Sequence, residues 1–491
     1  MFSSRTKAGT KPQGSQRPED ERLPAVQNIG FGLQHVLTMY GGIIAPPLII
    51  GTAAGLGEAE IGVLIASCLF VGGLATILQT VGVPFFGSQL PLVQGVSFAG
   101  VATMISILEG GGSISTVFGA VIAASVIGLV ITPIFSRIIR FFPPVVAGTV
   151  ITTIGLTLMP VAAGWTMGGN ASSPSYGSVQ NLGLAGITLV LVVIFSKIGV
   201  AAISRLSILL AMIGGTIIAA VTGMADFSKV LEGPIFAFPK PFAFGPPDFQ
   251  AAAILSMVIV ILVTLTETSA DIIAVGAIVG TKTDAKRVGD GLRADMVSSA
   301  ISPLFNSFTQ SAFAQNVGLV AITGVKSRFV VTAGGGILVV LGLLPVLGRF
   351  VAAIPTPVLG GAGIVLFGTV AASGIRTLST VEYEGNMNLV IVAAALGFGM
   401  FPIVAPNIYD QFPSWFVTIF HSGISSSAIM AIVLNLLFNH LKIRGNKPRS
   451  VMAEASSRRI SSAMLGELQE GDYVQDGKLF DAKSKHVPSA D

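Results

Sequence analysis

The chain has 491 residues, of which 52% are hydrophobic and only 11% are charged, and its mean hydropathy is +0.81. A soluble globular chain carries about 25% charged residues, so this composition excludes that class and indicates a polytopic membrane protein. The single cysteine, Cys68, excludes a disulfide framework and a cysteine-based metal or haem site, and the net charge of +4 says less than the positions of the charges.

Two polar tails flank the apolar part of the chain. Residues 1–26 are polar and charged, which predicts a disordered tail without a cleavable signal peptide. Residues 442–491 predict a second tail, with a short amphipathic helix near 460–468. Between the tails, about fourteen apolar segments approach the length that crosses a membrane core of ~30 Å. These segments lie near 28–51, 60–84, 89–108, 113–135, 143–163, 182–197, 206–224, 250–280, 291–308, 311–326, 328–346, 351–373, 387–405 and 415–441.

The basic residues between the segments test this count. With a cytoplasmic N-terminus, the loops after even-numbered segments hold eleven lysines and arginines, and the loops after odd-numbered segments hold three. This asymmetry follows the positive-inside rule, so we expect both termini in the cytoplasm and the protein in the plasma (inner) membrane. The eleven are Arg137, Arg140, Lys197, Arg205, Lys282, Lys286, Arg287, Arg293, Lys326, Arg328 and Arg376; the three are Lys229, Lys240 and Arg349.

Fourteen segments divide into two halves of seven. An odd number per half places two homologous halves in opposite orientations, as in the inverted repeats of secondary transporters. Two motif pairs support a repeat: residues 143–148 are similar to 355–361, and residues 94–97 are similar to 315–318. We therefore predict an all-α polytopic membrane protein with a 7+7 inverted repeat.

The third and tenth segments are short and polar in the middle. Adjacent amides such as Gln315 and Asn316 cost several kcal/mol each in hydrocarbon unless they are partnered. Paired breaks at matching positions indicate a transporter's midplane site. A half-helix that starts near Ser97 would direct the positive end of its dipole inward. Phe98 would then stack on a planar ring, although packing within the protein is an alternative role for it.

We predict different roles for the two amide side chains of the tenth segment. Gln315 offers a donor and an acceptor that suit two adjacent groups of a heterocycle, or a tether between helices. Asn316 must point elsewhere, and we expect it to hold the backbone around the break.

Few ionisable residues lie inside the apolar segments, and embedded carboxylates usually mark a substrate or ion pathway. Glu267 and Asp271 share one helix face because they are four residues apart, and two acids in low dielectric cannot both ionise cheaply. Such a group suits a proton-coupled carrier. Helix capping or a bond to a neighbouring helix is the alternative for these acids and for Asp295. A lone histidine on an apolar helix such as His35 is more often a core residue than a ligand, and an acid of a neighbouring helix, such as Asp295 or Asp271, is a candidate partner for it.

Several classes of site have no counterpart in the sequence. We find no nucleotide-binding loop, dinucleotide fingerprint, catalytic triad or metal-ligand cluster. Residues 110–112 and 334–336 are glycine triplets without a phosphate-binding context, and they predict a loop and a close-packing face. The chain is therefore expected to be neither an enzyme nor an ATP-driven pump, and to need no cofactor and no nucleic acid.

Several motifs of the chain resemble those of a known family. Gln315-Asn316-Val317-Gly318 followed by Thr323 is similar to the signature of the nucleobase–ascorbate transporter family. Five further motifs fall in the family's order across almost the whole membrane region. They are Gln34-His35, Gln94-x-x-Ser97-Phe98, the Phe-Pro-Pro start of the fifth segment, Glu267-x3-Asp271 and Asp295.

The resemblance implies a specific architecture. A core domain would comprise residues 27–135 and 250–346, and a gate domain, through which family members dimerise, would comprise 136–249 and 347–441. Segments 3 and 10 would each be a short strand followed by a half-helix. The resemblance also implies site roles: Glu267, Gln315, Phe98, Ser97 and the backbone at Ala314 would contact the base, and Glu267, Asp271, Asp295, His35 and Asn316 would serve proton coupling or support.

Within the family, Gln315 together with the Glu267-x3-Asp271 pair resembles the xanthine and uric acid branch. The uracil branch tends to carry Glu at the first position and His at the position of Asp271. The small side chain of Ser97 leaves room for the C8 oxygen of uric acid. We therefore expect a proton-coupled importer of uric acid, xanthine or both. Another nucleobase permease of the family, an anion carrier of the same architecture, and a channel or scaffold are the alternatives.

Overall fold

The computed structural model describes residues 17–135, 142–384 and 386–441, together with three short strands further on. The chain divides into two compact units, Met1–Val381 with Ile391–Leu441, and Glu382–Val390 with Lys442–Asp491. The three strands belong to the second unit and form an antiparallel sheet, β3 (Tyr473–Gln475), β4 (Lys478–Phe480) and β5 (His486–Val487). The amphipathic helix expected near 460–468 lies outside the described residues.

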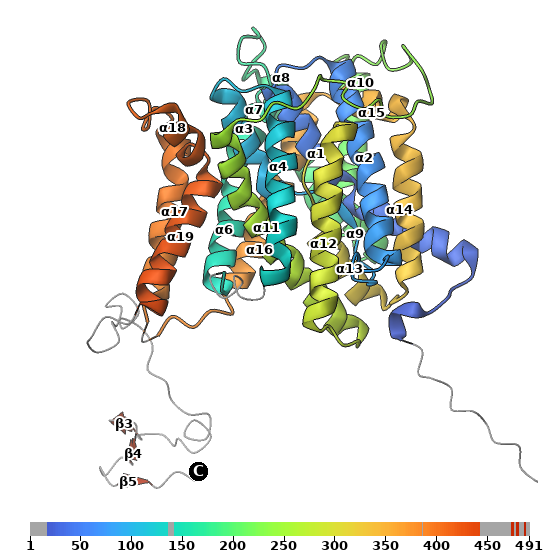
Figure 1. Cartoon of the computed structure of the whole chain (residues 1–491). Coiled ribbons are helices and arrows are strands. Elements are labelled where there is room, and N and C mark those ends of the chain that lie inside the picture. Colours follow the sequence, from blue (N-terminus) through green and yellow to red (C-terminus); the bar gives the residue numbers. More distant parts are fainter. Residues whose placement is uncertain are drawn as a thin grey trace, which may run out of the picture. The chain divides into compact units, whose positions relative to one another are not determined.

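Helices make up nearly all of the first unit (Figure 1). In its N-terminal half they are α1 (Ala25–Ala53), α2 (Glu58–Val81), α3 (Val101–Glu109), α4 (Ile114–Ile131), α6 (Pro144–Thr157), α7 (Met159–Thr166), α8 (Val179–Lys197), α9 (Ala201–Arg205) and α10 (Ser207–Val221). In its C-terminal half they are α11 (Ala251–Val279), α12 (Ala285–Ile301), α13 (Ala314–Thr323), α14 (Arg328–Gly342), α15 (Pro345–Ala352), α16 (Thr356–Leu378), α17 (Asn388–Val404), α18 (Ser414–Phe420) and α19 (Gly423–Asn435), which continues as a π-helical turn, η6 (Leu436–His440). Strands β1 (Gln94–Val96) and β2 (Gln310–Ala312) precede α3 and α13.

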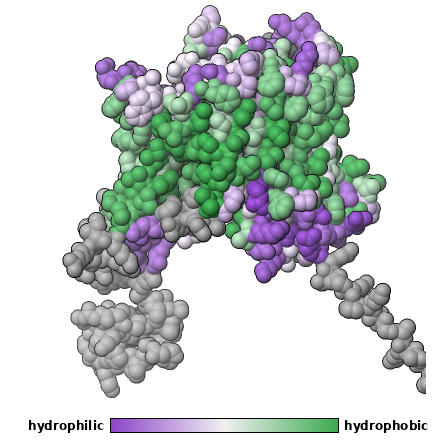
Figure 2. All heavy atoms as spheres, viewed as in Figure 1, coloured by the Kyte–Doolittle hydropathy of each residue, from purple (hydrophilic) through white to green (hydrophobic). Residues whose placement is uncertain are grey.

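The surface of the first unit is that of a membrane protein. Figure 2 shows a broad apolar band with hydrophilic residues gathered above and below it. Among the described residues, eight helices are long and apolar enough to cross a membrane, or nine if α14 and α15, bent by 78°, form one span. Shorter apolar helices and α12 occupy the remaining predicted segments. The mostly helical, membrane-spanning class is confirmed, and the number of fourteen spans stays a prediction.

Close helix packing depends on glycine at several contacts. α2 packs on α14, and a Cβ on Gly73 would lie 2.6 Å from the carbonyl oxygen of Gly335. Only glycine permits backbones to approach so closely. Gly334 and Gly335 lie at such contacts, against Gly32 and Gly73, whereas a Cβ on Gly336 would meet no atom within 4 Å, so the predicted close-packing face comprises the first two glycines of the triplet. Elsewhere α11 and α12 pack on α4, and α16 packs on α6, α7 and α8. The division into core and gate domains stays a prediction.

The N-terminal segment corrects the expected boundary of the first tail. Residues 1–16 lie outside the described part of the chain, but Pro18–Asp20 form a short 3-10 helix, η1, and α1 begins at Ala25. Glu19 is fully buried. We call residues 17–21 the N-terminal latch.

Two ion pairs hold the N-terminal latch. Glu19 Oε1 lies 2.6 Å from Arg287 Nη2, and Asp20 Oδ1 lies 2.7 Å from Arg328 Nε. Ser327 Oγ also donates to Glu21 O at 2.6 Å. The polar composition of this segment led to a prediction of disorder. Composition does not show that two acids of the segment form ion pairs with arginines of α12 and α14.

Candidate functional site

Two short strands pair with each other inside the first unit. β1 (Gln94–Val96) and β2 (Gln310–Ala312) are fully buried and pair antiparallel. The ladder continues past them, since Phe313 N donates to Val93 O at 3.0 Å. Backbone groups at membrane depth must be satisfied within the protein. The pairing of the two breaks meets this requirement for both.

Hydroxyl groups on neighbouring helices fix the two strands. Thr76 Oγ1 of α2 accepts a hydrogen bond from Gln94 N at 2.9 Å. Thr268 Oγ1 of α11 accepts one from Ala312 N at 3.3 Å. Each strand is therefore attached to a long helix as well as to the other strand, and the positions of the residues that follow the strands are well defined.

A helix begins directly after each strand. After β1, Ser97 caps the 3-10 turn η2 (Phe98–Gly100), which leads into α3. After β2, α13 begins at Ala314. The first N–H groups of a helix lack intrahelical partners and form the positive end of its dipole. Because Phe98 and Ala314 line the same cavity, the positive ends of both half-helices meet there.

The cavity beside the strands, which we call the central cavity, has a volume of about 690 Å³. It lies between the two broken segments, α11, and the helices α6 and α16. It extends from the strands toward the C-terminal ends of α11, α13 and α16, where Ile278, Ala321 and Arg376 line it. A mainly apolar cavity of this size with a few polar groups is typical of a small-molecule site. The predicted site residues that line it are Phe98, Glu267, Asp271, Ala314 and Gln315.

The acidic residues of this region have no cationic partner in contact. Among the described residues, Glu267, Asp271 and Asp295 form no salt bridge. Asp295 is buried on α12 behind the cavity, next to Thr268 and Glu267 of α11. An ionised carboxylate without a partner is costly in such surroundings. These groups are therefore the ones that a substrate donor or a proton would stabilise.

Asn316 and His35 form a buried pair outside the cavity. Asn316 Nδ2 donates to His35 O at 3.1 Å and lies 3.0 Å from His35 Nδ1. With Nδ1 accepting from the amide, neutral His35 carries its proton on Nε2. The amide replaces the expected partner, Asp295 or Asp271, because the break places the first turn of α13 against α1.

Ser97 does not lie where the sequence placed it. Its side chain is buried, and its Oγ accepts a hydrogen bond from Ala99 N at 3.2 Å instead of lining the central cavity. A serine one residue before a helix is a favoured N-cap. The hydroxyl serves the half-helix, and Phe98 and Ala99 are the residues of this turn that line the cavity.

The strand register corrects one of the two motif matches between the halves. Gln94 pairs with Ala312 and Val96 pairs with Gln310, so Gln94 and Gln310 hold equivalent places as the first residues of β1 and β2, and Gln310 lies five residues before Gln315. Residues 94–97 were matched with 315–318 because their sequences are similar, although 315–318 follow the strand instead of forming it. The other match holds, since Pro143 and Pro355 each directly precede a helix, α6 and α16.

Sequence reasoning missed the contribution of α16. Arg376 was counted as a loop cation, but it lies within α16 and lines the central cavity with Thr369 and Ser373. Asp271 of α11 lines the same cavity. The three polar residues of α16 are spaced by four and three on an otherwise apolar helix, and this spacing was the signal for a polar face.

Known proteins resemble this chain over most of its length. A family model described as "Permease family" matches residues 26–408. The uric acid transporter UacT of Escherichia coli (strain K12) is 39% identical over 87% of this chain and 89% of its own length. The xanthine permease of Bacillus subtilis (strain 168) is 38% identical over 84% and 94%. The uric acid permease PucJ of the same Bacillus strain is 39% identical over 83% and 92%.

Solved structures share the fold at low identity. The transmembrane domain of a cyanobacterial bicarbonate transporter, BicA, matches with a TM-score of 0.54 at 16% identity, over 84% of this chain and 98% of that domain. The structure of SLC26A9 matches with a TM-score of 0.57 at 12% identity, over 84% and 66%. These likenesses support the 7+7 inverted-repeat fold class. The family match and the identities to the permeases show that the chain is a transporter that belongs to the nucleobase–ascorbate transporter family.

Proposed function

We propose that the protein is a symporter that imports a purine nucleobase, uric acid or xanthine, together with protons. Relatives named as uric acid and xanthine permeases support the substrate class. The observation that carries the proposal is the central cavity, where the carboxylate of Glu267, the amide of Gln315 and the ring of Phe98 line one space.

These three groups suit a planar, polar, bicyclic base. The Gln315 side chain can hydrogen-bond two adjacent groups on the ring edge, and ionised Glu267 can accept a ring N–H. Phe98 offers a face for stacking, and its ring is oriented by an edge contact with Phe367, with centroids 6.2 Å apart at 72°. The free N–H groups at the start of α13, near Ala314, suit the carbonyl oxygens of the dioxopyrimidine ring that uric acid and xanthine share.

Proton coupling would use the acids that lack ion pairs. Glu267 faces the cavity and would alternate between protonated and ionised forms as substrate binds and leaves. Asp271 lies one turn further along α11 and would share this role, and Asp295 lies behind both. His35 and Asn316 would fix α13 against α1. No cofactor is needed, since the proton gradient supplies the free energy.

The direction of the cavity supports an inward-facing state. The ends of α11 and α13 toward which it extends adjoin the loops that carry Lys282 and Lys326, which the charge pattern assigns to the cytoplasm. Transport would then require the broken segments and α11 to move relative to α6 and α16. We also propose cytoplasmic termini, a plasma (inner) membrane location and a homodimer formed through the gate domain.

Uptake of radiolabelled uric acid and xanthine by cells that express the protein tests the proposal. We expect saturable uptake of at least one base, and loss of accumulation when an uncoupler collapses the proton gradient. Accumulation that survives the uncoupler would contradict proton coupling. Thermal stabilisation of the purified protein by a panel of bases tests the branch, because a bound ligand stabilises the folded state by mass action. Stabilisation by uracil alone would assign the protein to the uracil branch.

An anion carrier is the second candidate. Arg376 in the central cavity and the fold shared with a bicarbonate transporter favour it. Glu267 opposes it, because a carboxylate in the cavity would repel an anion. Competition separates the two functions: inhibition of uptake by sulfate or bicarbonate, without inhibition by unlabelled purines, would identify an anion carrier.

A further inference from the structure

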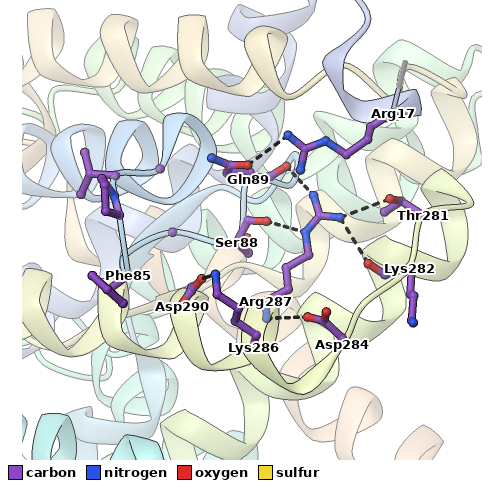
Figure 3. Close-up of a pocket in the computed structure, with 14 residues that line it drawn as sticks. Arg17, Phe85, Ser88, Gln89, Thr281, Lys282, Asp284, Lys286, Arg287 and Asp290 are labelled. Atoms are coloured by element: carbon purple, nitrogen blue, oxygen red, sulfur yellow. Dashed lines mark hydrogen bonds and ion pairs between the residues drawn. The ribbon is translucent and has the colours of Figure 1, made fainter. Parts of the chain in front are cut away.

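A second cavity, of about 620 Å³, lies at the end of α2 and α12 (Figure 3). It is formed by the loop 82–89 after α2, the residues 281–290 from the α11–α12 loop into α12, and Arg17 of the N-terminal latch. It shares no lining residue with the central cavity. The transport mechanism proposed above does not use it, and we call it the basal cavity.

Positive charge dominates the lining of the basal cavity. Arg17, Lys282 and Lys286 line it, and among the described residues Lys282 Nζ has no hydrogen-bond or ion-pair partner. The Lys286 side chain is 76% exposed. An adjoining cavity of about 440 Å³ shares Arg17 and adds the cations Arg22 and Lys326, with the carboxylate Glu21.

The acidic residues of the basal cavity are already engaged. Asp290 forms salt bridges with Lys286, at 3.0 Å, and with Arg293. Asp284 caps α12 by accepting a hydrogen bond from Arg287 N at 2.8 Å. The Arg287 guanidinium is likewise used, since it donates to Glu19 of the latch. Arg17 and Lys286 also form ion pairs, with Asp20 and Asp290 at 3.0 Å each, but Asp290 is shared with Arg293 and Asp20 with Arg328. The charge that remains for a ligand is therefore that of Lys282, supplemented by the partly paired Arg17 and Lys286.

An unpartnered hydroxyl lies in the wall of the basal cavity. Ser88 is 1% exposed, and its Oγ has no hydrogen-bond partner among the described residues. Its backbone N–H donates to Gln79 Oε1 at 3.2 Å, and its carbonyl accepts from Arg287 Nε at 2.7 Å. Buried polar atoms are normally hydrogen-bonded. A free hydroxyl beside several cations is suited to an oxygen-rich anion.

Apolar surface leads directly to the basal cavity. Val63, Leu74 and Val81 are exposed on α2 and are spaced by 11 and 7 residues, which places them on one helix face. Phe85, in the loop four residues after Val81, lines the cavity and is 66% exposed. An exposed apolar stripe on a membrane helix faces lipid acyl chains. Lysines and arginines at the end of such a stripe are typical of contacts with lipid headgroups.

We propose that the basal cavity binds the phosphate of an anionic phospholipid whose acyl chains lie along the exposed stripe of α2. The lysines and Arg17 contact the phosphate, and Phe85 contacts the glycerol and the first methylenes. A choline headgroup fits less well, because its own positive charge would lie among the cations. The bound lipid would join the latch, the α2 loop and α12 at one surface.

Lipid titration of the purified full-length chain in a neutral detergent tests the proposal. We expect dioleoylphosphatidylglycerol, and not dioleoylphosphatidylcholine, to raise the melting temperature and to remain bound in native mass spectrometry. The double variant Lys282→Gln/Lys286→Gln should bind the anionic lipid about 30-fold more weakly, since each lysine contributes ~1 kcal/mol at a lipid surface. The matched control is Lys229→Gln/Lys240→Gln, which removes two exposed lysines from other loops and should bind like the wild type.

The result that overturns the proposal is equal binding of phosphatidylglycerol by the wild type and the double variant, or equal stabilisation by both lipids. Inorganic phosphate and Phe85→Asn distinguish a lipid from a soluble anion. Asparagine tolerates the positive φ of 72° at this position. We expect this variant to weaken lipid binding without changing any effect of phosphate. If phosphate competes with the lipid and Phe85→Asn changes neither, the site takes a soluble anion and the lipid assignment is wrong.

Discussion

The N-terminal latch and the central cavity both place glutamates away from bulk solvent, but they treat the charge differently. In the latch, the carboxylate of Glu19 meets the guanidinium of Arg287. In the central cavity, Glu267 forms no salt bridge with any described residue. Removal of one partner from a buried ion pair leaves an uncompensated charge, so such a pair holds the structure together. An acid without a counter-ion depends on a substrate or a proton, and this difference separates support from transport.

The largest effect is expected at Glu267. Glu267→Gln keeps the size of the side chain but removes both the charged acceptor and the site of protonation. We expect uptake of uric acid and xanthine to fall about 100-fold, since a hydrogen bond to a charged group contributes up to about 3 kcal/mol. Radiolabelled uptake measures it, with Glu232→Gln in an exposed loop as the control. Unchanged uptake by Glu267→Gln would remove this residue from the mechanism.

A substitution that disrupts the N-terminal latch should lower the stability of the protein and leave its substrate preference unchanged. Glu19→Ala leaves Arg287 partly buried without its counter-ion, and breaking a buried pair costs about 3 kcal/mol or more. We expect a clearly lower melting temperature in detergent and an unchanged KM for uptake by the folded protein. Glu21→Ala is the matched control, because this exposed side chain has no hydrogen-bond or ion-pair partner among the described residues. Equal melting of the two variants would show that the latch is not a structural element.

Gln315 and Asn316 provide the same contrast within two adjacent residues. Gln315 lines the central cavity, whereas Asn316 is buried against His35. Gln315→Glu should change the relative preference among bases about tenfold, because it replaces an amide donor with a second acceptor. Asn316→Ala should lower uptake of every base in the same proportion. Competition by unlabelled bases measures both, and a changed preference in Asn316→Ala would contradict the assignment.

The smallest effect is expected from acidification of the latch. Partial burial acts to raise the pKa of Asp20, but the hydrogen bond and charge of Arg328, with Arg17, outweigh it and hold the pKa below its usual value of 3.8. The carboxylate therefore stabilises the fold above pH ~4, and this contribution is lost as the pH falls through the lower folded pKa.

The variant Asp20→Asn tests this pH dependence. Its melting temperature should lie slightly below that of the wild type from neutral pH down to about pH 4, by an amount equivalent to less than ~1 kcal/mol because solvent screens the pair. The difference should disappear on further acidification. A difference that grows toward low pH would contradict the sign of the pKa shift.

Local chemistry made much of the fold and the site predictable. The positions of the membrane helices follow from apolar length, since a bilayer sets the number of residues that a span needs. Gln315 and Asn316 were assigned to different surroundings because adjacent side chains of a helix point in different directions. Glu267 and Asp271 were placed on one face by their spacing, and both line the central cavity.

The differences from the sequence expectations have two sources, which are local ambiguity at Ser97 and Arg376 and contacts between distant segments at His35 and Glu19. Ser97 was expected in the site, but a hydroxyl before a helix also caps it, and the sequence does not decide between the two roles. Arg376 was assigned to a loop because the end of a span is uncertain by a few residues. The partner of His35 and the burial of Glu19 depend on which segments the fold brings together, and no local pattern records that.

The sequence by itself determined the membrane class, the approximate spans, the two broken segments and the family, because hydrophobic length and the order of motifs are local properties of the chain. Only the tertiary structure decided that β1 pairs with β2 in a register that places Gln94 opposite Ala312 and Val96 opposite Gln310. It also decided that α16 contributes Arg376 to the central cavity and that a polar N-terminal segment becomes a buried latch. The physical reason is that the strand pairing and the ion pair of the latch join residues 200 or more positions apart, and the packing of the helices determines which distant residues meet.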